Sequence, residues 1–272
     1  MKVDQHTADA FASSWNNLPS GSVYTQEQVI DWFEPLSPED FRGARVLELG
    51  CGNASLMVHV LRWSPAWLDG IDLGAAVVSA ENNLAASGHA NWSLRKEDLT
   101  TFASNGYDIV YSIGVLHHLA DPRRGFDSVL RNTRAGGRFH CWVYAREGNA
   151  IVILVVEPIR RLAARLPWWL TKYGIATPLV FPYFLYARLL AALPRWPVLR
   201  SLPLYEYSLW IAKREFAFFR HVAFDQLVSP RTVYLDRSTV EGWLASDERI
   251  VPGSTYVVMR NGNSWKFGGR VR

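Results

Sequence analysis

One stretch of nine residues constrains the fold of this chain more than any other. Residues 46–54, Val-Leu-Glu-Leu-Gly-Cys-Gly-Asn-Ala, read as a short apolar strand that ends in an acid and breaks into glycines, with a helix expected over 55–62. Such a turn presents bare backbone N–H groups at the carboxyl end of the strand, which is where open parallel sheets bind their ligands. The stretch therefore predicts a ligand-binding turn.

The position of the acid indicates the charge of the ligand. The pattern Glu48-x-Gly50-x-Gly52-x-Ala54 lacks the last glycine of the dinucleotide fingerprint G-x-G-x-x-G, and it places a carboxylate before the first glycine. A carboxylate beside the turn repels a pyrophosphate but attracts an ammonium or a sulfonium group. We therefore expect a cationic ligand. The alternative is an ordinary glycine turn with Glu48 in solvent.

Two more acids follow strand ends. Asp72 ends a strand expected over 67–73, at the sequence distance from Glu48 where an acid on the next strand reaches a ribose hydroxyl pair. Asp98 follows a third strand, where it would accept from a purine amino group while Leu99 packs on the ring. The alternatives are a helix cap for Asp72 and a surface charge for Asp98.

The alternation of strands and helices predicts the fold class. Strands expected over 107–112 and 138–144 flank a helix that begins with Asp121 as N-cap and Pro122 at its first position. We expect a doubly wound, mostly parallel, seven-stranded α/β sheet. A capping box, Ser238 to Glu241, opens a helix over 239–245, and strands over 249–251 and 255–260 are expected to form a last hairpin through Pro252-Gly253, followed by a folded-back or loose tail.

The expected organisation is one domain in four parts. Residues 1–40 form a helical cover in which Trp15 and Tyr24 are candidates for contacting a ligand, and Thr25 with Gln28 predicts a capping box. Residues 41–147 form the ligand-binding core. Residues 148–222 are an apolar helical insertion, and residues 223–272 complete the sheet.

Composition excludes several classes of function. The two cysteines form no metal or redox spacing, so we expect no metal and a reduced, cytoplasmic setting. The net charge of +4 comes without a dense basic run, so no nucleic-acid partner is expected. The longest uncharged run, Tyr173 to Ala187, has fifteen residues and two prolines, short of the about 20 that a spanning helix needs, so no transmembrane segment is expected.

The chain resembles the class I S-adenosylmethionine-dependent methyltransferases. The match rests on five motifs in order: residues 46–54, 70–73 and 97–99, the region 107–119 with its Gly-Val-Leu-His-His, and the turn and strand 134–144. The departure is Ala54, where the family usually carries glycine. Phe224 to Val228, Pro230, Tyr234 and the late Asn-Gly-Asn-Ser-Trp also resemble a bacterial subgroup, from which we take no substrate.

The resemblance implies a site for S-adenosylmethionine, with S-adenosylhomocysteine as product. Glu48, Gly50 and Gly52 would hold the methionine part, Asp72 the ribose, and Asp98 with Leu99 the adenine. Ser112, Gly114 and Val115 would line the floor. The remaining positions assigned to cofactor binding are Cys51, Asn53 and Leu73.

Methyl transfer from a sulfonium needs alignment and the exclusion of water, and no covalent residue. An acceptor of high pKa also needs a base, for which His118 and His117 are the first candidates, since imidazole takes a proton near neutral pH. Tyr144 and Asp225 are further candidates. The alternative for the histidines is packing against the adenine side.

The apolar insertion leaves three interpretations open. It can close as a lid over a bulky apolar acceptor, lie on a membrane surface through residues 150–204 with its tryptophans and arginines at the interface, or simply pack on the sheet. The first two favour a small or lipid-like acceptor. The rival functions are an enzyme that uses the cofactor without methylation, such as a cyclase, and a membrane-docking or partner-docking protein with a vestigial pocket.

Overall fold

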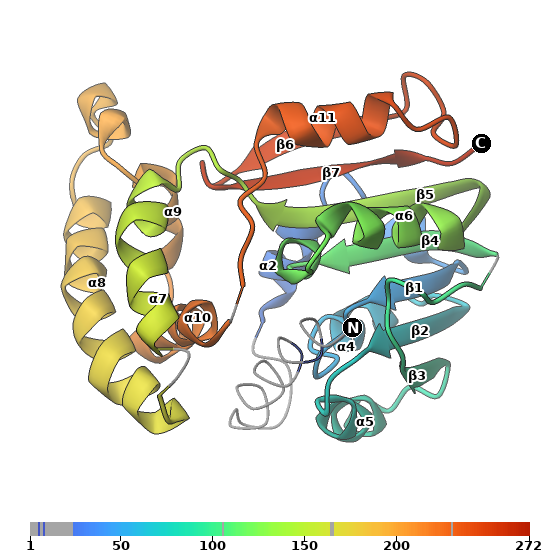
Figure 1. The fold of residues 1–272 in the computed structure, drawn as a ribbon, viewed down its shortest axis with the longest axis horizontal. Coiled ribbons are helices and arrows are strands. Elements are labelled where there is room, and N and C mark those ends of the chain that lie inside the picture. Colours follow the sequence, from blue (N-terminus) through green and yellow to red (C-terminus); the bar gives the residue numbers. More distant parts are fainter. Residues whose placement is uncertain (1–4, 6–7, 9–23, 105, 164–165, 230) are drawn as a thin grey trace. The chain divides into compact units, whose positions relative to one another are not determined.

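The computed structural model describes residues 5, 8, 24–104, 106–163, 166–229 and 231–272 (Figure 1). Within them the chain forms one seven-stranded sheet in the order β3-β2-β1-β4-β5-β7-β6. The strand bounds are β1 Arg45–Leu49, β2 Trp67–Asp72, β3 Trp92–Lys96, β4 Tyr107–Ile113, β5 Thr133–Tyr144, β6 Tyr256–Arg260 and β7 Ser264–Arg270. The first five strands pair in parallel, as the alternation of elements predicted.

Helices cover both faces of the sheet. One face carries α2 Gln26–Phe33, α3 Pro38–Phe41, α4 Met57–Leu61 and α5 Val77–Ala86, which share a buried cluster with Val46, Leu68 and Tyr111. The other face carries α6 Pro122–Asn132 and α11 Arg237–Ala245, where Phe126 of α6 stacks on Trp243 of α11 at 5.7 Å between ring centroids (Figure 1). The doubly wound fold is confirmed.

Capping residues in the sequence predicted the first residues of several helices correctly. The Thr25 and Gln28 capping box is present, and Asp121 caps α6 with Pro122 at its first turn. The expected box at Ser238 was wrong, because Asp236 caps α11 instead and its carboxylate accepts from the Thr239 N–H at 2.8 Å. Of the cover 1–40, Trp15 lies outside the described residues.

The last hairpin lies later in the chain than expected. The strand expected over 249–251 is reduced to a single bridge between Ile250 and Val271. The hairpin instead joins β6 to β7 through residues 261–263, where Asn261 and Gly262 have positive φ as tight hairpin turns require. The segment expected as a tail is therefore a buried strand.

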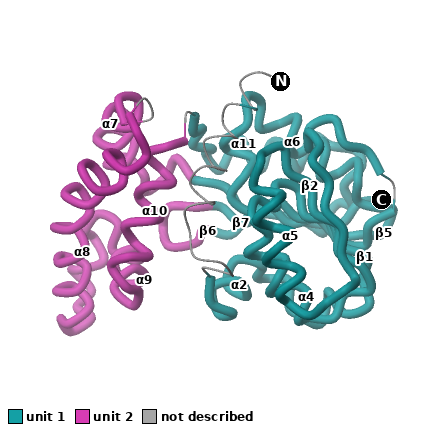
Figure 2. Tube along the Cα trace, turned by 90° about the horizontal axis from the view of Figure 1, so that it is seen from below, with its two compact units in different colours: residues 1–144, 231–258, 265–272 teal, residues 145–230, 259–264 magenta. Residues whose placement is uncertain are grey.

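The chain divides into two compact units (Figure 2). The first comprises residues 1–144, 231–258 and 265–272, and the second comprises 145–230 and 259–264, a longer segment than the expected insertion 148–222. The helices of the second unit are π-helical Val152–Val156, α7 Glu157–Ala163, π-helical Leu170–Ala176, α8 Thr177–Ala192, 3₁₀ Pro197–Ser201, α9 Tyr205–Ile211 and α10 Phe216–Val228. They enclose a core of their own around Phe184, Phe219 and Phe224.

The longest helix of the second unit continues through two prolines. Residues Leu170–Ala192 form one helix of 23 residues that runs through Pro178 and Pro182. The helix is long and apolar enough to cross a membrane by length and composition, although such a segment is weak evidence by itself. The sequence predicted a segment too short to span a membrane, because its uncharged run has fifteen residues and two prolines. The helix is longer than that run, because a π-helical segment precedes α8 and continues into it.

Candidate functional site

The turn after β1 is fixed by the end of β2. Gly50 and Cys51 both donate their N–H groups to the carbonyl of Ile71, at 2.7 and 3.1 Å. Gly50 has φ +87°, and a Cβ there would overlap the side chain of Val115. A glycine is therefore required at this position, both for the backbone conformation and for the close approach of the loop after β4.

Asp72 closes the same turn from β2. Its carboxylate accepts the N–H of Gly52 at 2.9 Å and that of Gly74 at 2.7 Å. Burial raises the pKa of Asp72, while these backbone N–H groups lower it. Asp72 thus lies beside the glycine turn, as the sequence predicted, and helps to shape it.

Glu48 is buried beside the turn. It is 1% exposed, and the hydroxyl of Tyr111 on β4 donates to its carboxylate at 2.7 Å. Burial raises its pKa to about 8, the hydrogen bond from Tyr111 opposes that rise, and the nearby charge of Asp72 adds to it. The two carboxyl groups are therefore close enough to interact, and the edge of the sheet between them disfavours further negative charge.

The other residues of the turn are packed. Asn53 is 3% exposed, and its side chain accepts from the backbone N–H and the hydroxyl of Ser55. Asn83 of α5 donates to the Asn53 carbonyl at 2.9 Å, which ties the turn to the next helix. Burial raises the pKa of the Cys51 thiol well above its usual value, so this side chain is a neutral wall.

Ala54 occupies the position where the class I methyltransferases, which the sequence resembles, usually have glycine. It is buried and has φ +61°, in the left-handed region that an alanine occupies only at a cost of about 1–2 kcal/mol. The backbone therefore keeps the glycine conformation despite the substitution.

The adenine candidates follow β3. Glu97 N–H donates to the Asp72 carbonyl at 3.1 Å, so the ends of β2 and β3 are tied together. Asp98 accepts from the backbone N–H and hydroxyl of Thr100, at 2.8 and 2.7 Å, and so opens a turn. Leu99 is 6% exposed.

The end of β4 supplies the predicted floor. Ser112 is fully buried and donates to the Leu49 carbonyl at 2.9 Å. Gly114 has φ +77° and donates to the Trp142 carbonyl of β5 at 3.0 Å. Val115 then faces Gly50 across the turn. These residues therefore meet the glycine turn at one edge of the sheet.

An aromatic cluster begins two residues after Val115. The ring of His117 lies 4.2 Å from that of His118 and 4.1 Å from that of Tyr144, between ring centroids. Trp142 and Tyr234 extend the cluster, at 6.0 Å from His117 and 6.1 Å from Tyr144 respectively. Three of the predicted catalytic residues are thus brought together.

The two histidines differ in their capacity to accept a proton. His117 is fully buried, its ring nitrogens have no hydrogen-bond partner among the described residues, and burial lowers its pKa well below the usual value. His118 places Nδ1 2.9 Å from the carbonyl of Arg231, so Nδ1 carries the proton and Nε2 is the basic nitrogen. His118 therefore suits a base better than His117.

Tyr24 and Asp225 belong to different units of the chain. The carbonyl of Tyr24 faces Nε2 of His59 at 3.0 Å, and its ring meets Trp32 edge-on at 4.7 Å. Asp225 lies on α10 in the second unit, where its carboxylate is 3.1 Å from Nε2 of His221. The ring of Trp32 lies 6.2 Å from that of Trp142, so Tyr24 adjoins the aromatic cluster through Trp32.

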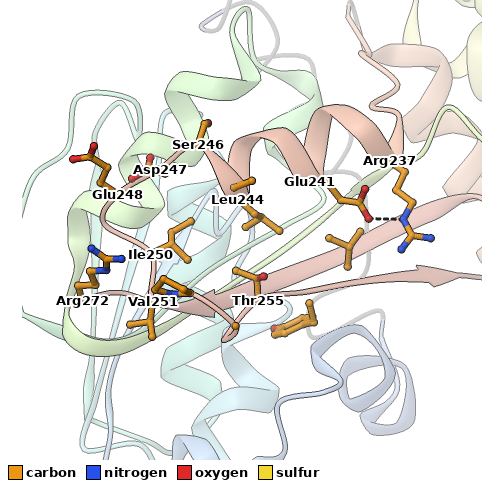
Figure 3. Close-up of a pocket in the computed structure, with 15 residues that line it drawn as sticks. Arg237, Glu241, Leu244, Ser246, Asp247, Glu248, Ile250, Val251, Thr255 and Arg272 are labelled. Carbon is orange, nitrogen blue, oxygen red and sulfur yellow. Dashed lines mark hydrogen bonds and ion pairs between the residues drawn. The ribbon is translucent and has the colours of Figure 1, made fainter.

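A cavity of about 500 Å³ lies beside α11, away from the predicted site (Figure 3). Its lining comes from α11, the turn 246–253 and the first residues of β6, and it includes none of the predicted site residues. Among its charged side chains, Arg237 is paired with Glu241 and Asp247 with Arg249. Within the residues that the structure describes, no three His, Cys, Asp or Glu side chains gather as a metal site.

Sequence reasoning missed Tyr111 and Asn83. Tyr111 shares one face of β4 with Ile109 and Ile113, so in the sequence it resembles an ordinary core residue, and only its hydroxyl contact with Glu48 distinguishes it. Asn83 lies in the interior of a helix, where a polar residue usually faces solvent. No sequence signal identified its contact with the turn.

Comparisons with known proteins agree with this architecture. Residues 47–139 match a family described as a methyltransferase domain. The chain is 29% identical over 161 residues to a tRNA U34 carboxymethyltransferase of Pseudomonas paraeruginosa, covering 54% of this chain and 50% of that protein. It is 30% identical over 131 residues to a ubiquinone biosynthesis O-methyltransferase of Xanthomonas oryzae, covering 46% and 54%. The chain spans about half the length of these curated relatives.

Solved structures share the fold over the whole chain. Magnesium protoporphyrin IX methyltransferase from Synechocystis, solved with bound S-adenosylhomocysteine, has a TM-score of 0.56 at 14% identity and covers 100% of this chain and 98% of its own. The N-methyltransferase NodS from Bradyrhizobium japonicum has a TM-score of 0.54 at 12% identity, with 98% of both chains covered. The family match is confined to residues 47–139, and the likeness to these structures shows that the chain has the Rossmann-like fold of class I methyltransferases.

Proposed function

We propose that this protein is an S-adenosylmethionine-dependent methyltransferase that transfers a methyl group in line to a small or lipid-like acceptor. The observation that carries the proposal is the meeting of Glu48, the glycine turn and Asp72 where β1 and β2 end. The family match over residues 47–139 supports the same assignment.

The residues at this edge fit the cofactor. Glu48 is buried against a neutral hydroxyl, and its raised pKa has no basic side chain among its causes, so a cationic ligand group would compensate its charge. Asp72 is positioned to accept from ribose hydroxyls, and the segment with Asp98 and Leu99 would contact the adenine. When bound, the cofactor supplies a methyl group made electrophilic by its sulfonium sulfur.

The residues of the chain then orient and deprotonate the acceptor. His118 is held by the Arg231 carbonyl with Nε2 as its basic nitrogen, and it follows Val115 by only three residues. We assign it to take the proton that the acceptor atom loses on methylation. His117, Trp142 and Tyr144 supply an aromatic wall beside it, which favours an apolar or ring-containing acceptor.

The relatives do not fix the acceptor. One is named for a tRNA and another for ubiquinone biosynthesis, and both alignments cover only about half of each protein. The family match over residues 47–139 includes the glycine turn and Asp72, whereas the second unit lies outside it. The apolar second unit is the feature that favours a lipid-like acceptor over a nucleic acid.

Calorimetry of the full chain with S-adenosylmethionine and S-adenosylhomocysteine tests the proposal. We expect both to bind, Asp72→Asn and Glu48→Gln to weaken binding, and the exposed Glu81→Gln to leave it unchanged. The absence of binding of either compound at millimolar concentration would refute the assignment. Release of S-adenosylhomocysteine with a panel of phenols, quinols and fatty acids then identifies the acceptor, and product without that release would indicate a non-methylating enzyme.

A further inference from the structure

The second unit carries the opposite charge to the rest of the chain. Its sequence contains twelve Lys and Arg against five Asp and Glu, whereas the remainder has seventeen against twenty. No acidic residue occurs between Glu157 and Glu206, a segment that contains seven Lys and Arg. A single-signed segment of this length creates a positive potential that attracts anionic surfaces.

The same unit exposes large apolar side chains. On α8, Phe181, Leu185 and Leu189 follow one another at i, i+4 spacing and are 48%, 53% and 63% exposed. Val180 and Phe184 of α8, on the side that faces the rest of the unit, are buried in its core. The helix is therefore apolar on both its inner and its outer side, which is unusual for a helix that faces water.

A second stripe lies on the helix that begins the unit. Ile151, Leu154, Val155 and Leu162 are exposed there, with Arg161 beside them. Exposed aromatic side chains accompany both stripes: Trp168, Trp169, Tyr173 and Trp196. Outward apolar stripes with tryptophan and basic residues are typical of helices that lie in the headgroup region of a bilayer.

We propose that the second unit binds the surface of an anionic phospholipid bilayer. The outer side of α8 and the exposed tryptophans enter the headgroup region, and Arg161, Arg195 and Arg200 contact the anionic lipid headgroups. The positive charge selects a lipid surface of negative charge over a neutral one. This inference does not depend on the proposed methyl transfer.

The unit lies on the bilayer and does not span it. Although Leu170–Ala192 is long enough to cross, its inner side holds the core of the unit. The hydroxyls of Tyr183 and Ser208 lie 2.7 Å apart, and Thr171 donates to the Ala163 carbonyl at 2.9 Å. A spanning helix would lose these contacts and leave the core of α9 and α10 open.

Sedimentation of the full chain with lipid vesicles tests the proposal. We expect binding to vesicles of phosphatidylcholine with phosphatidylglycerol, much weaker binding to phosphatidylcholine alone, and release in high salt or at alkaline pH. Resistance to both treatments would indicate a spanning helix and overturn surface binding. Absence of binding to anionic vesicles would overturn the proposal, as would a stable dimer in solution that buries the apolar stripes.

Substitutions at exposed positions separate the two contributions. Arg161→Gln, Arg195→Gln and Arg200→Gln are each expected to lower partitioning to anionic vesicles about fivefold, the equivalent of about 1 kcal/mol per basic residue. Leu185→Gln with Leu189→Gln should lower partitioning to both vesicle types. The matched control is Val78→Gln, an exposed apolar position in the first unit, which should leave partitioning unchanged. Equal losses in the control would refute the assigned surface, and circular dichroism verifies that each variant is folded.

Discussion

Replacement of Glu48 by Gln is expected to stabilise the ligand-free protein, by an amount that grows with pH. Burial raises the pKa of this carboxyl from 4.5 to about 8. The folded state therefore holds the proton more tightly than the unfolded chain does. The stabilisation from this proton is fully present at a pH below the pKa of Glu48 in the unfolded chain, and it is lost as the pH rises through the folded-state pKa of about 8. Glutamine has no proton to lose, and its side-chain oxygen still accepts from Tyr111.

The expected size follows from the two pKa values. A difference of about 3.5 between them corresponds to roughly 4.8 kcal/mol once the carboxyl is ionised in both states, at about 1.4 kcal/mol for each tenfold change. At pH 5 only about 1 kcal/mol of this has been lost. Between pH 5 and pH 9 the wild-type protein should therefore lose about 4 kcal/mol relative to Glu48→Gln, a large share of a typical stability of 5–15 kcal/mol.

The assay is urea unfolding of both proteins at intervals from pH 5 to pH 9. Because the chain has two compact units, hydrogen exchange at the amides of β1 and β4 reports the relevant unit separately. Glu81→Gln, at an exposed position, controls for the loss of one negative charge. Stability curves of wild type and Glu48→Gln that stay parallel across this range would refute the buried-carboxylate reasoning.

Three further predictions concern other parts of the first unit. His118→Gln should lower methyl transfer at least about 100-fold while calorimetry shows unchanged cofactor affinity, since it removes a base and not a cofactor contact; an equal loss of affinity would contradict this. Gly268→Ala should cost about 1–3 kcal/mol in urea unfolding, because a Cβ there overlaps the Phe139 carbonyl and the Tyr256 ring. Ala54→Gly should change stability by less than about 1 kcal/mol, since relief of the left-handed backbone is offset by a lost buried methyl and a freer unfolded chain. A gain above about 2 kcal/mol would contradict that balance.

Sequence predicted the parallel half of the sheet because each of its elements carries a local signal. Apolar strands, acids at strand ends and caps such as Asp121 are all readable within a few residues. The final hairpin was misplaced because Pro252-Gly253 is the conspicuous turn, while Asn261-Gly262 was read as the start of a tail. The strand after it contains Gly268 and Gly269, which lower strand propensity. At Gly268 a side chain would overlap the Phe139 carbonyl of β5 and the Tyr256 hydroxyl of β6.

The candidate site could be predicted only in part, because some of its contacts join residues far apart in the sequence. Glu48, Gly50 and Asp72 follow a spacing that strand geometry imposes, so their meeting could be expected. The contact of Tyr111 with Glu48 crosses 63 positions in sequence and depends on the pairing of β1 with β4. His118 could be named, but the carbonyl that selects its tautomer belongs to Arg231, in a loop without any periodic pattern.

The electrostatics of the turn connect stability to function. Burial raises the pKa values of both Glu48 and Asp72, so the ligand-free protein carries two carboxyl groups whose ionised forms are disfavoured. A bound cation would lower the pKa of Glu48 from about 8 and restore its charge, so ligand binding at neutral pH should release a proton from this carboxyl. A protein optimised for stability alone would place apolar residues here. The proposed binding of a positively charged ligand would account for the two acids at the ends of neighbouring strands, and proton release measured by calorimetry in buffers of different ionisation enthalpy tests it directly. Release that persists undiminished in Glu48→Gln would show that the protons come from elsewhere.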